Sequence, residues 1–435
     1  MNVNEFKRRR RQLMRMMGDD SIAILPTASE FIRNNDVFHA YRPDSDFFYL
    51  TGFPEPQALM VLIPGRPQGE YILFCREKNP EKEMWDGFIE GLEGAVEHYG
   101  ADDAFPITDV DDILPGLLEN REQVYFAVGS NPAFDKKVSD WVAQIRMKSR
   151  SGVHGPTSFL ALDHFLHDMR LYKSRSEVAA LRKAAKISAV GHKKMMSKSK
   201  PGMYEYQLAS IFEHHCQMQG STRLAYPSIV GGGNNGCVLH YIDNKDALNK
   251  GDLVLIDAGC EWDCYASDIT RTWPVSGQFS EEQAALYQLV LDAQHAAIEQ
   301  VKPGNHWNDP HNAAVKVLTK GLIKLGLIKG TLAKAIKDKS YSRFYMHRTG
   351  HWLGMDVHDV GDYKVDGHWR ELEPGMVLTI EPGLYIPKDT KRVAKKWQGI
   401  GIRIEDDVLV TKDGYDVLTK DVPKEIKEIE ALMAK

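Results

Sequence analysis

The chain has 435 residues, a formal net charge of −5 and 43% hydrophobic residues. This length allows two domains on the usual size of about 100 to 200 residues each, and the apolar content can fill their cores. The acidic balance disfavours a nucleic-acid-binding protein, because phosphate contacts need a basic surface. Since no run approaches the ~18 consecutive apolar residues of a membrane helix, we also expect no membrane partner.

The cysteines and the first residues favour a cytoplasmic protein. Five cysteines are scattered along the chain without a Cys-x-x-Cys pair, which fits a reducing compartment better than a disulfide scaffold. The basic cluster at residues 7–11 is not followed by the apolar segment of a signal peptide. We therefore interpret this cluster as the solvated face of a first helix.

Residues 1–172 are predicted to form an N-terminal domain of mixed α/β type. The aromatic segment at residues 41–53 is interpreted as a loop that leads into a buried strand. A long lysine-rich helical pattern follows at residues 177–196, so residues 173–435 are predicted to form a second domain. The strand-like runs of the first domain, separated by Pro/Gly turns and helical stretches, are residues 21–25, 58–63, 71–74 and 124–128.

A glycine-rich segment follows a second predicted helix at residues 204–219. Its three consecutive glycines lack the Lys-Ser/Thr of a phosphate loop and the Gly-x-Gly-x-x-Gly spacing of a dinucleotide site. We expect the segment to turn the chain and to bring Tyr226 and His240 to a common place. A single histidine such as His240 is, by itself, more often structural than catalytic.

The stretch at residues 252–271, DLVLIDAGCEWDCYASDITR, is the most informative part of the chain. Its apolar alternation predicts a strand that ends at Asp257, and Asp268 follows eleven residues later. The pattern puts the two carboxylates at the ends of two adjacent strands joined by a turn. Aspartates also start turns and cap helices, so this pair alone does not decide in favour of a metal site.

Three histidines lie close together in a later segment. His347, His351 and His358 are interrupted by glycines, and they are too irregular for one helix face and too dense for an ordinary surface loop. Imidazoles in such a group are candidates for metal binding and proton transfer. Their spacing does not choose which of the three is a ligand.

Two further predicted strands end in carboxylates. Residues 376–381 place Glu381 at the end of an apolar strand, and residues 401–405 place Arg403 and Glu405 on one face of another. Both carboxylates need a reason to lie where a buried strand ends.

Four strand-end carboxylates and one imidazole have the composition of a centre with two divalent ions. Their mostly oxygen ligands favour Mn²⁺, Co²⁺ or Fe²⁺ over a cysteine-rich zinc site. Two ions about 3.5 to 4 Å apart can share a water, lower its pKa to near neutral and deliver hydroxide to a polarised carbonyl. A Gly-x-Ser-x-Gly elbow, a His-Glu-x-x-His helix, a P-loop and a catalytic cysteine motif are all missing from the sequence. The residues therefore favour a two-metal hydrolase.

Five motifs resemble the metal motifs of the pita-bread metallopeptidases, which comprise aminopeptidase P, prolidase and methionine aminopeptidase. With the segment ending in FFYLTGF, the resemblance covers nearly the whole chain and is strongest to bacterial aminopeptidase P, the Xaa-Pro aminopeptidase branch. It implies an α/β (α+β) fold, with a creatinase-like N-terminal domain before a pita-bread catalytic domain. The motifs are DAG from Asp257, SDITRTW around Asp268, HWLGMDVHDVG from His351, TIEPGLY around Glu381 and GIRIED around Glu405.

The resemblance also implies a role for each residue of the metal centre. Asp268 and Glu405 would bridge two Mn²⁺ ions, and Glu381 would take the proton from the bridging water. His240 and His358 would surround the reacting carbonyl, where they stabilise the tetrahedral intermediate and move protons. The full set of implied metal ligands is Asp257, Asp268, His351, Glu381 and Glu405.

Other residues are implied to bind the substrate. Tyr226, His347 and Arg403 would form the pocket for the proline ring. Asp36 of the N-terminal domain would lie near the amino end of the substrate, and Trp85 would come from a neighbouring subunit of a homo-oligomer, a tetramer or a dimer.

The implied activity is release of the N-terminal residue from peptides with proline in the second position, Xaa-Pro-Yaa. Prolidase, the main alternative, shares the fold and ligands but is restricted to dipeptides. Methionine aminopeptidase is disfavoured because it lacks a large creatinase-like N-terminal domain. A non-catalytic interaction protein of the same fold is a further alternative, although such modules usually have eroded metal ligands and this chain keeps five.

Overall fold

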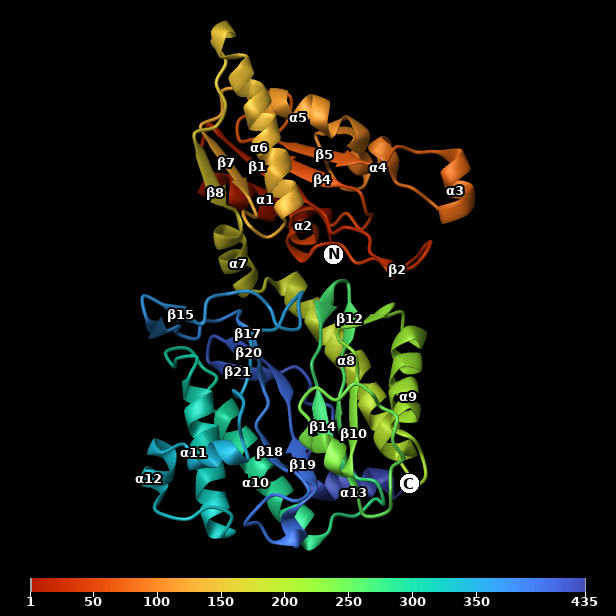
Figure 1. Cartoon of the computed structure of the whole chain (residues 1–435), viewed down its shortest axis with the longest axis vertical. Coiled ribbons are helices and arrows are strands. Elements are labelled where there is room, and N and C mark those ends of the chain that lie inside the picture. Colours follow the sequence, from red (N-terminus) through yellow and green to blue (C-terminus); the bar gives the residue numbers. More distant parts are fainter. Residues whose placement is uncertain (1, 435) are drawn as a thin grey trace. The chain divides into compact units, whose positions relative to one another are not determined.

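The computed structural model describes residues 2–434, which form two compact units that divide between Met169 and Arg170. The sequence analysis put the domain boundary after residue 172. Helices and strands occur in both units, so the expected mixed α/β class is confirmed (Figure 1).

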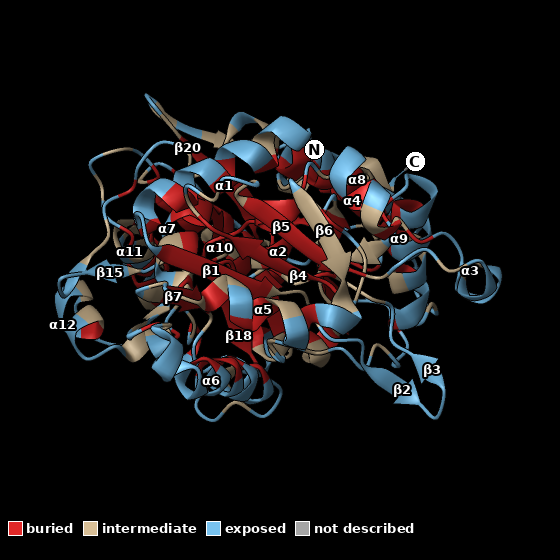
Figure 2. Cartoon of the chain, turned by 90° about the horizontal axis from the view of Figure 1, so that it is seen from above, coloured by how far each residue is buried: buried red, intermediate tan, exposed pale blue. Residues whose placement is uncertain are grey.

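The N-terminal unit is built on a six-stranded mixed sheet with the order β6-β5-β4-β1-β7-β8. β1 pairs in parallel with β7 and antiparallel with β4. The strands β1, β4, β5 and β7 are largely buried and form the core of this unit, while β6 is only partly buried and the helices around the sheet keep exposed faces (Figure 2). The strands are β1 (Ser21–Pro26), β2 (Ile32–Asn34), β3 (Val37–Phe38), β4 (Leu59–Leu62), β5 (Tyr71–Cys75), β6 (Asp103–Pro106), β7 (Gln123–Phe126) and β8 (Ser158–Ala161). The helices are α1 (Val3–Met17), α2 (Ser45–Thr51), α3 (Pro80–Asp86), α4 (Gly91–Glu97), α5 (Val110–Leu118), α6 (Pro132–Met147) and α7 (Asp163–Leu171).

Helix α1 shows that the basic cluster is only partly solvated, which corrects the sequence interpretation. Arg9 and Arg10 are buried, and each donates a hydrogen bond to a backbone carbonyl of α2. Their guanidinium carbons lie 4.0 Å from the ring centre of Tyr49 and 3.9 Å from that of Tyr71, respectively. Cation–π contacts and carbonyl acceptors compensate for the lost hydration, so these two arginines attach α1 to its unit.

Residues 41–53 contain helix α2 and not the expected loop. The Asp44 side chain accepts a hydrogen bond from the backbone N–H of Phe47 and caps the helix, and Gly52 ends it in the left-handed conformation with φ of 68°. Phe47, Phe48 and Tyr49 are buried on this short helix. Aspartate before the run and glycine after it are helix signals that the aromatic composition obscured.

The C-terminal unit contains two groups of antiparallel strands, and each group has its own pair of long helices. Helices α8 and α9 pack against the sheet region that contains β10, β11 and β14, and α10 and α11 belong to the region of β17 to β20 (Figure 1). Gly401 lies where the two groups meet, because a Cβ atom there would come within 2.1 Å of the Gly236 carbonyl oxygen. The glycine therefore permits the close approach of the two halves.

The long helices at residues 177–196 and 204–219 were predicted from the sequence and are confirmed. The helices of the C-terminal unit are α8 (Arg175–Lys198), α9 (Glu205–Met218), α10 (Glu281–Ile298), α11 (Asp309–Lys324), α12 (Leu332–Lys337) and α13 (Ile426–Met433). The strands are β9 (Arg223–Leu224), β10 (Ile229–Gly232), β11 (Leu253–Asp257), β12 (Cys260–Trp262), β13 (Tyr265–Ala266), β14 (Thr270–Pro274), β15 (Lys364–Val365), β16 (His368–Trp369), β17 (Val377–Ile380), β18 (Gly383–Ile386), β19 (Ile400–Arg403), β20 (Asp406–Thr411) and β21 (Gly414–Val417).

The connection between Asp257 and Asp268 is more than the expected turn. Asp257 ends β11, and it pairs with Thr270 at the start of the adjacent strand β14. Between these strands the chain forms a separate hairpin, β12 and β13, which pairs with β9. The pairing of β11 with β14 therefore brings the two carboxylates close together. The hairpin that connects these strands belongs to a different sheet.

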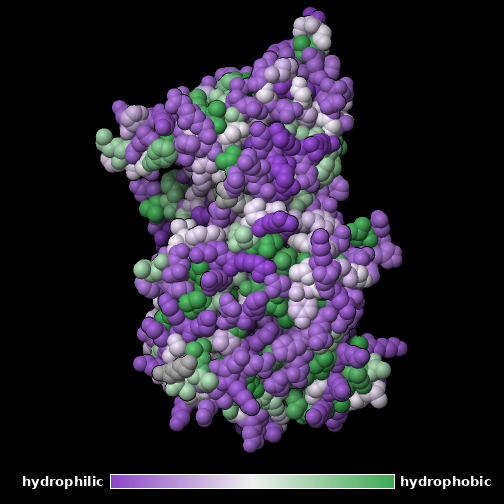
Figure 3. Space-filling view, turned by 180° about the vertical axis from the view of Figure 1, so that it is seen from behind, coloured by the Kyte–Doolittle hydropathy of each residue, from purple (hydrophilic) through white to green (hydrophobic). Residues whose placement is uncertain are grey.

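Within residues 2–434, no helix is long and apolar enough to cross a membrane. Hydrophilic side chains cover most of the face in Figure 3, and apolar side chains lie there in small separate groups.

A buried ion-pair cluster at the start of the C-terminal unit generates a pH-dependent stability. Asp359 accepts hydrogen bonds from Arg170 (2.6 Å) and Lys173 (2.8 Å), and all three side chains are almost fully buried. Burial raises the pKa of Asp359, but the two cations outweigh burial and hold its pKa below the ordinary value. The stabilisation is therefore complete above the unfolded pKa of about 3.9 and is lost as the pH falls through the lower folded value.

We expect Asp359→Asn to lower the free energy of unfolding by about 3 kcal/mol at pH 7, because Lys173 loses its buried counter-charge. Below pH ~4 the difference from the parent should shrink. Denaturant unfolding at several pH values measures both effects. The matched control is Asp356→Asn: Asp356 also pairs with Arg170 (2.8 Å), but its side chain is 38% exposed, so we expect a loss below about 1 kcal/mol. Equal losses for the two variants at pH 7 would contradict this account.

Candidate metal centre

A cavity of about 450 Å³ in the C-terminal unit brings together most of the residues singled out in the sequence. Apolar side chains, among them Ile229, Leu239, Ile242 and Val357, form part of its wall. The sequence-predicted residues that line it are Tyr226, His240, Asp257, Asp268, His347, His351, His358, Glu381, Arg403 and Glu405.

Asp257 and Asp268 are linked by a shared donor. The Tyr226 hydroxyl lies 2.6 Å from Asp257 Oδ1 and 2.5 Å from Asp268 Oδ1. Both carboxylates are buried at strand ends of the β10-β11-β14 sheet. Burial and the charge of Asp268 raise the pKa of Asp257, although Arg403 Nη2 donates to Asp257 Oδ2 at 2.8 Å.

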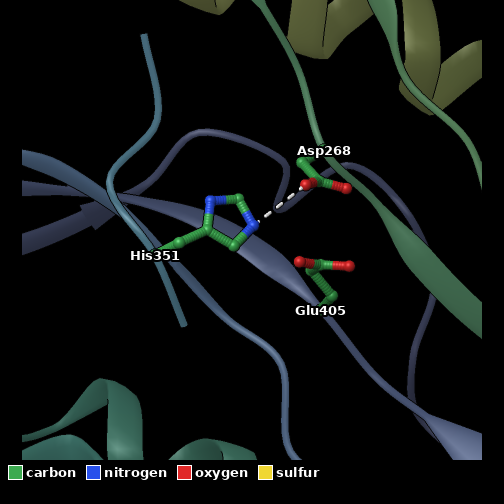
Figure 4. Close-up of side chains that lie close together, drawn as sticks. All are labelled: Asp268, His351 and Glu405. Atoms are coloured by element: carbon green, nitrogen blue, oxygen red, sulfur yellow. Dashed lines mark ion pairs between the residues drawn. The ribbon is translucent and has the colours of Figure 1, made fainter. Parts of the chain in front are cut away.

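A hydrogen bond of its Nδ1 atom fixes the orientation of the His351 ring. Its Nδ1 lies 2.9 Å from the Trp352 carbonyl oxygen, to which it donates, so Nε2 is the nitrogen that faces the carboxylates. Nε2 lies 3.3 Å from Asp268 Oδ2, and a dashed line marks this pair in Figure 4. Asp268, His351 and Glu405 each offer one ligand atom, and these three atoms lie within 4.8 Å of one another. Of the three candidate histidines, His351 thus has the geometry of a metal ligand.

Glu405 and Arg403 meet through a buried threonine. Thr270 Oγ1 donates to Glu405 Oε2 at 2.6 Å and accepts from Arg403 Nε at 3.1 Å. A threonine hydroxyl has one donor and two acceptor positions, so it can serve both groups at once. Strand β14 therefore orients Glu405 although that residue lies far away in the sequence.

Glu381 is brought toward the other ligands by the backbone around His351. Glu381 N donates to the Thr349 carbonyl at 2.8 Å, and Thr379 N donates to the His351 carbonyl at 2.9 Å. A Cβ atom on Gly350 would lie 1.9 Å from the Thr379 carbonyl oxygen, so this position requires glycine. The close pairing places Glu381 Oε1 3.9 Å from His351 Nε2.

The pKa values record how strongly the carboxylates repel one another. Burial and the charges of neighbouring carboxylates raise the pKa of Glu381 to about 7 and that of Glu405 well above its ordinary value. Burial lowers the pKa of His351, but the hydrogen bond to Asp268 and the charges of Asp268 and Glu381 together outweigh burial and raise the pKa to about 9. Groups in this environment favour a nearby positive charge.

The donor set fits divalent metal ions. The buried carboxylates of Asp257, Asp268 and Glu405 and the partly buried carboxylate of Glu381 supply hard oxygen donors, and the neutral form of His351 supplies Nε2. Bound cations would replace the mutual repulsion of the carboxylates by attraction.

His347 lies in a neutral hydrogen-bonded chain and not among the metal-ligand candidates. Burial and Arg403 lower its pKa to about 3. Its Nδ1 lies 2.7 Å from the Arg348 carbonyl oxygen, and its Nε2 lies 2.9 Å from the Tyr385 hydroxyl, which also accepts from Arg403 Nη1 at 3.0 Å. The sequence analysis missed Tyr385 and Thr270. Both lie inside quoted motifs, TIEPGLY and SDITRTW, but no spacing rule identifies them as partners of Arg403.

His240 and His358 both line the cavity. The ring of His358 lies 4.3 Å from that of His351, edge to face, and burial together with His351 lowers its pKa. His240 is exposed at the cavity and reaches it from the segment after β10. The expectation that the glycine-rich segment brings Tyr226 and His240 to a common place agrees with this arrangement.

Two predicted substrate residues belong to the N-terminal unit. Asp36 lies in the exposed turn between β2 and β3, and Trp85 lies on α3 with 87% of its surface exposed. Neither is among the residues that line the cavity.

Comparison with known proteins identifies similar chains of known family. Residues 179–412 match the model of metallopeptidase family M24, and residues 6–125 match the N-terminal domain of aminopeptidase P. The chain is 42% identical to Xaa-Pro aminopeptidase of Escherichia coli over 99% of this chain and 97% of that protein. It is 34% identical to human Xaa-Pro aminopeptidase 3, over 98% of this chain and 85% of that protein.

Solved structures show the same fold. Aminopeptidase PepP of Pseudomonas aeruginosa is 58% identical with a TM-score of 0.99, covering 100% of this chain and 98% of that chain. A variant of Escherichia coli aminopeptidase P in complex with substrate is 41% identical with a TM-score of 0.97, covering 100% of this chain and 98% of that chain. The expected fold, a creatinase-like N-terminal domain followed by a pita-bread domain, is thereby confirmed.

The bond between Thr270 and Glu405 predicts an effect on metal affinity. Thr270→Val keeps the side-chain volume but leaves Glu405 without its donor and Arg403 Nε without its acceptor. We expect Mn²⁺ affinity, measured by titration calorimetry, to fall about 10- to 100-fold, as for other lost partners of metal ligands. Thr272→Val is the matched control on the same strand face, because Thr272 Oγ1 bonds only to the backbone of Arg403. Similar affinities for the Thr270 variant and the parent would show that this bond does not orient Glu405.

Proposed function

The chain belongs to metallopeptidase family M24 and carries the N-terminal domain of aminopeptidase P, and from this premise we propose that it hydrolyses the Xaa-Pro bond of Xaa-Pro-Yaa peptides and releases the N-terminal residue. One observation carries the proposal. All five candidate metal ligands line one cavity in a chain that aligns over nearly its full length with Xaa-Pro aminopeptidases.

Two divalent ions, which we propose to be Mn²⁺, complete the centre. The oxygen-rich donor set supports manganese over softer metals. When bound, such ions lower the pKa of a shared water and polarise the peptide carbonyl. Asp268 and Glu405 would be shared by both ions, which agrees with their proximity to each other and to His351. The residues that would hold the ions are Asp257, Asp268, His351, Glu381 and Glu405.

Glu381 is the residue that we assign to proton transfer. Burial raises the pKa of Glu381 to about 7 without bound cations, and bound metal ions would lower it, so that the ionised carboxylate can accept a proton. Glu381 would take a proton from the attacking water and return it to the nitrogen of the leaving proline. His358, whose lowered pKa keeps it neutral, and His240 would donate hydrogen bonds to the oxygen of the reacting carbonyl.

The proline ring would bind beside Tyr226, His347 and Arg403. Apolar neighbours in the same cavity wall suit the faces of a pyrrolidine ring, and the neutral His347 adds an imidazole wall. Arg403 is held by Asp257, Thr270 and Tyr385, so it shapes the pocket as a rigid group.

The remaining parts of the proposal follow from the family resemblance. Asp36 would lie near the amino group of the substrate, and Trp85 would contribute from a neighbouring subunit of a tetramer or dimer. Domain limits of 1–172 and 173–435 belong to the same proposal. All five cysteines are free thiols, which supports a reducing location such as the cytoplasm.

Asp268→Asn tests the metal centre. Because the amide removes a shared anionic ligand, we expect at least a 10³-fold loss of kcat and a loss of bound metal in elemental analysis, with the far-UV circular dichroism of the parent. Asp263→Asn is the control, because Asp263 lies in the exposed turn of the β12–β13 hairpin with φ of 56°, which asparagine tolerates. An Asp268→Asn protein that turns over at the parent rate would refute the assignment.

A peptide panel tests the substrate. The Mn²⁺-loaded protein should cleave Ala-Pro-Leu and release alanine, and it should cleave Ala-Ala-Leu at least 100-fold more slowly, since a site shaped for proline loses its fit. Liquid chromatography of the products measures both rates. If the protein hydrolysed the dipeptide Ala-Pro but not Ala-Pro-Leu, the result would favour prolidase and contradict the proposed activity.

A further inference from the structure

Arg348 lies at the cavity with its charge uncompensated by the protein. It lines the same cavity as the candidate metal ligands, and its side chain is exposed. Within residues 2–434 no carboxylate forms an ion pair with it. The other arginine of the cavity wall, Arg403, is buried and paired with Asp257 at 2.8 Å. Arg348 is therefore the arginine of this cavity that is available to an anionic ligand.

Two contacts hold the Arg348 guanidinium in place without neutralising it. Its Nη2 donates to Asn308 Oδ1 at 2.5 Å, and its Cζ lies 4.8 Å from the ring centre of Trp369. Of the five N–H groups of a guanidinium, this one is the only one bonded to the protein in the part of the chain that the structure describes. A guanidinium that is already oriented loses less entropy when it binds a carboxylate.

The neighbouring hairpin adds positive charge at the same place. Lys364 Nζ of β15 lies 4.5 Å from the ring centre of Trp369, the ring that Arg348 also contacts. Lys364 is not among the residues that line the cavity, whose wall carries the candidate metal ligands as well as Arg348. The cavity wall thus combines the carboxylates of the proposed reaction centre with the guanidinium of Arg348, the residue that follows His347 in the sequence.

A bound peptide would place its C-terminus beside Arg348. With the scissile carbonyl at the metal centre and proline against His347, the next residue lies only about 3.5 Å further along an extended chain. Arg348 follows His347 directly in the sequence and lines the same cavity. We propose that Arg348 binds the free C-terminal carboxylate of Xaa-Pro-Yaa tripeptides and thereby sets a preference for short peptides with a free C-terminus. This inference rests on the proposed function and specifies its substrate class.

The test compares Ala-Pro-Leu with its C-terminal amide, which differ only in the anionic charge. For the parent we expect kcat/KM to be about fivefold to tenfold higher for the acid, in the range of an exposed charge-assisted hydrogen bond. Raising the salt from 0.05 M to 1 M should reduce this ratio because the pair is exposed to solvent. Arg348→Gln should bring the ratio close to one, through a higher KM for the acid. Arg348→Lys should keep part of it, since lysine retains the charge without the planar fork.

Arg343→Gln provides the matched control. Arg343 is an exposed arginine five residues upstream that contacts Phe344 and does not line the cavity, so its loss should leave the ratio as in the parent. A ratio in Arg348→Gln within twofold of the parent value would overturn the proposal while leaving the proposed function intact. A parent protein that cleaves neither peptide would overturn the proposed function, and this inference with it.

Discussion

Electrostatic crowding in one cavity is the constraint on which the C-terminal unit depends. Asp257, Asp268, Glu381 and Glu405 come from four strand ends to line one cavity, and like charges crowded in a largely buried place are unfavourable without compensation. The fold supplies part of the compensation through Arg403, through the Tyr226 hydroxyl and through Thr270. These groups orient the carboxylates, but burial together with the charges of neighbouring carboxylates still raises the pKa values of Glu381 and Glu405. Divalent cations bound at this centre would offset the electrostatic cost that remains.

The same principle organises the buried charges that support the cavity. Asp406 directly follows Glu405 and is paired with Arg271 (2.7 Å) and Lys424 (2.8 Å), which hold its pKa below the ordinary value against the effect of burial. Asp359 directly follows His358 and is paired with Arg170 and Lys173. In both places a fully paired aspartate lies next to a residue of the cavity. Such pairs add little net stability over apolar packing, but they fix the position of the adjacent backbone.

The sequence predicted the anionic part of the site well because strand periodicity is a local property. Alternation alone indicates that Asp257 and Glu381 end buried strands, and a carboxylate at such a point needs a cation or a donor. The contacts that select His351 over its neighbours, or that join Thr270 to Glu405, connect residues far apart in the chain and leave no local pattern. The errors have a related cause: Arg9 and Arg10 are buried because aromatic rings and carbonyls from another helix receive them.

The charges of the cavity also bear on why a peptide would lose a single residue from its N-terminus in each reaction. A cavity of about 450 Å³ is in the range that holds a small ligand, so it accommodates the end of a peptide more readily than a folded protein segment. The candidate metal ligands line this cavity, and Arg348, which also lines it, carries a positive charge that no carboxylate of residues 2–434 pairs with. With its C-terminal carboxylate at Arg348, a peptide would have its scissile bond near the cluster of carboxylates, whereas the reversed peptide would direct its ammonium group at Arg348. The field of the cavity therefore favours the orientation that aminopeptidase chemistry requires.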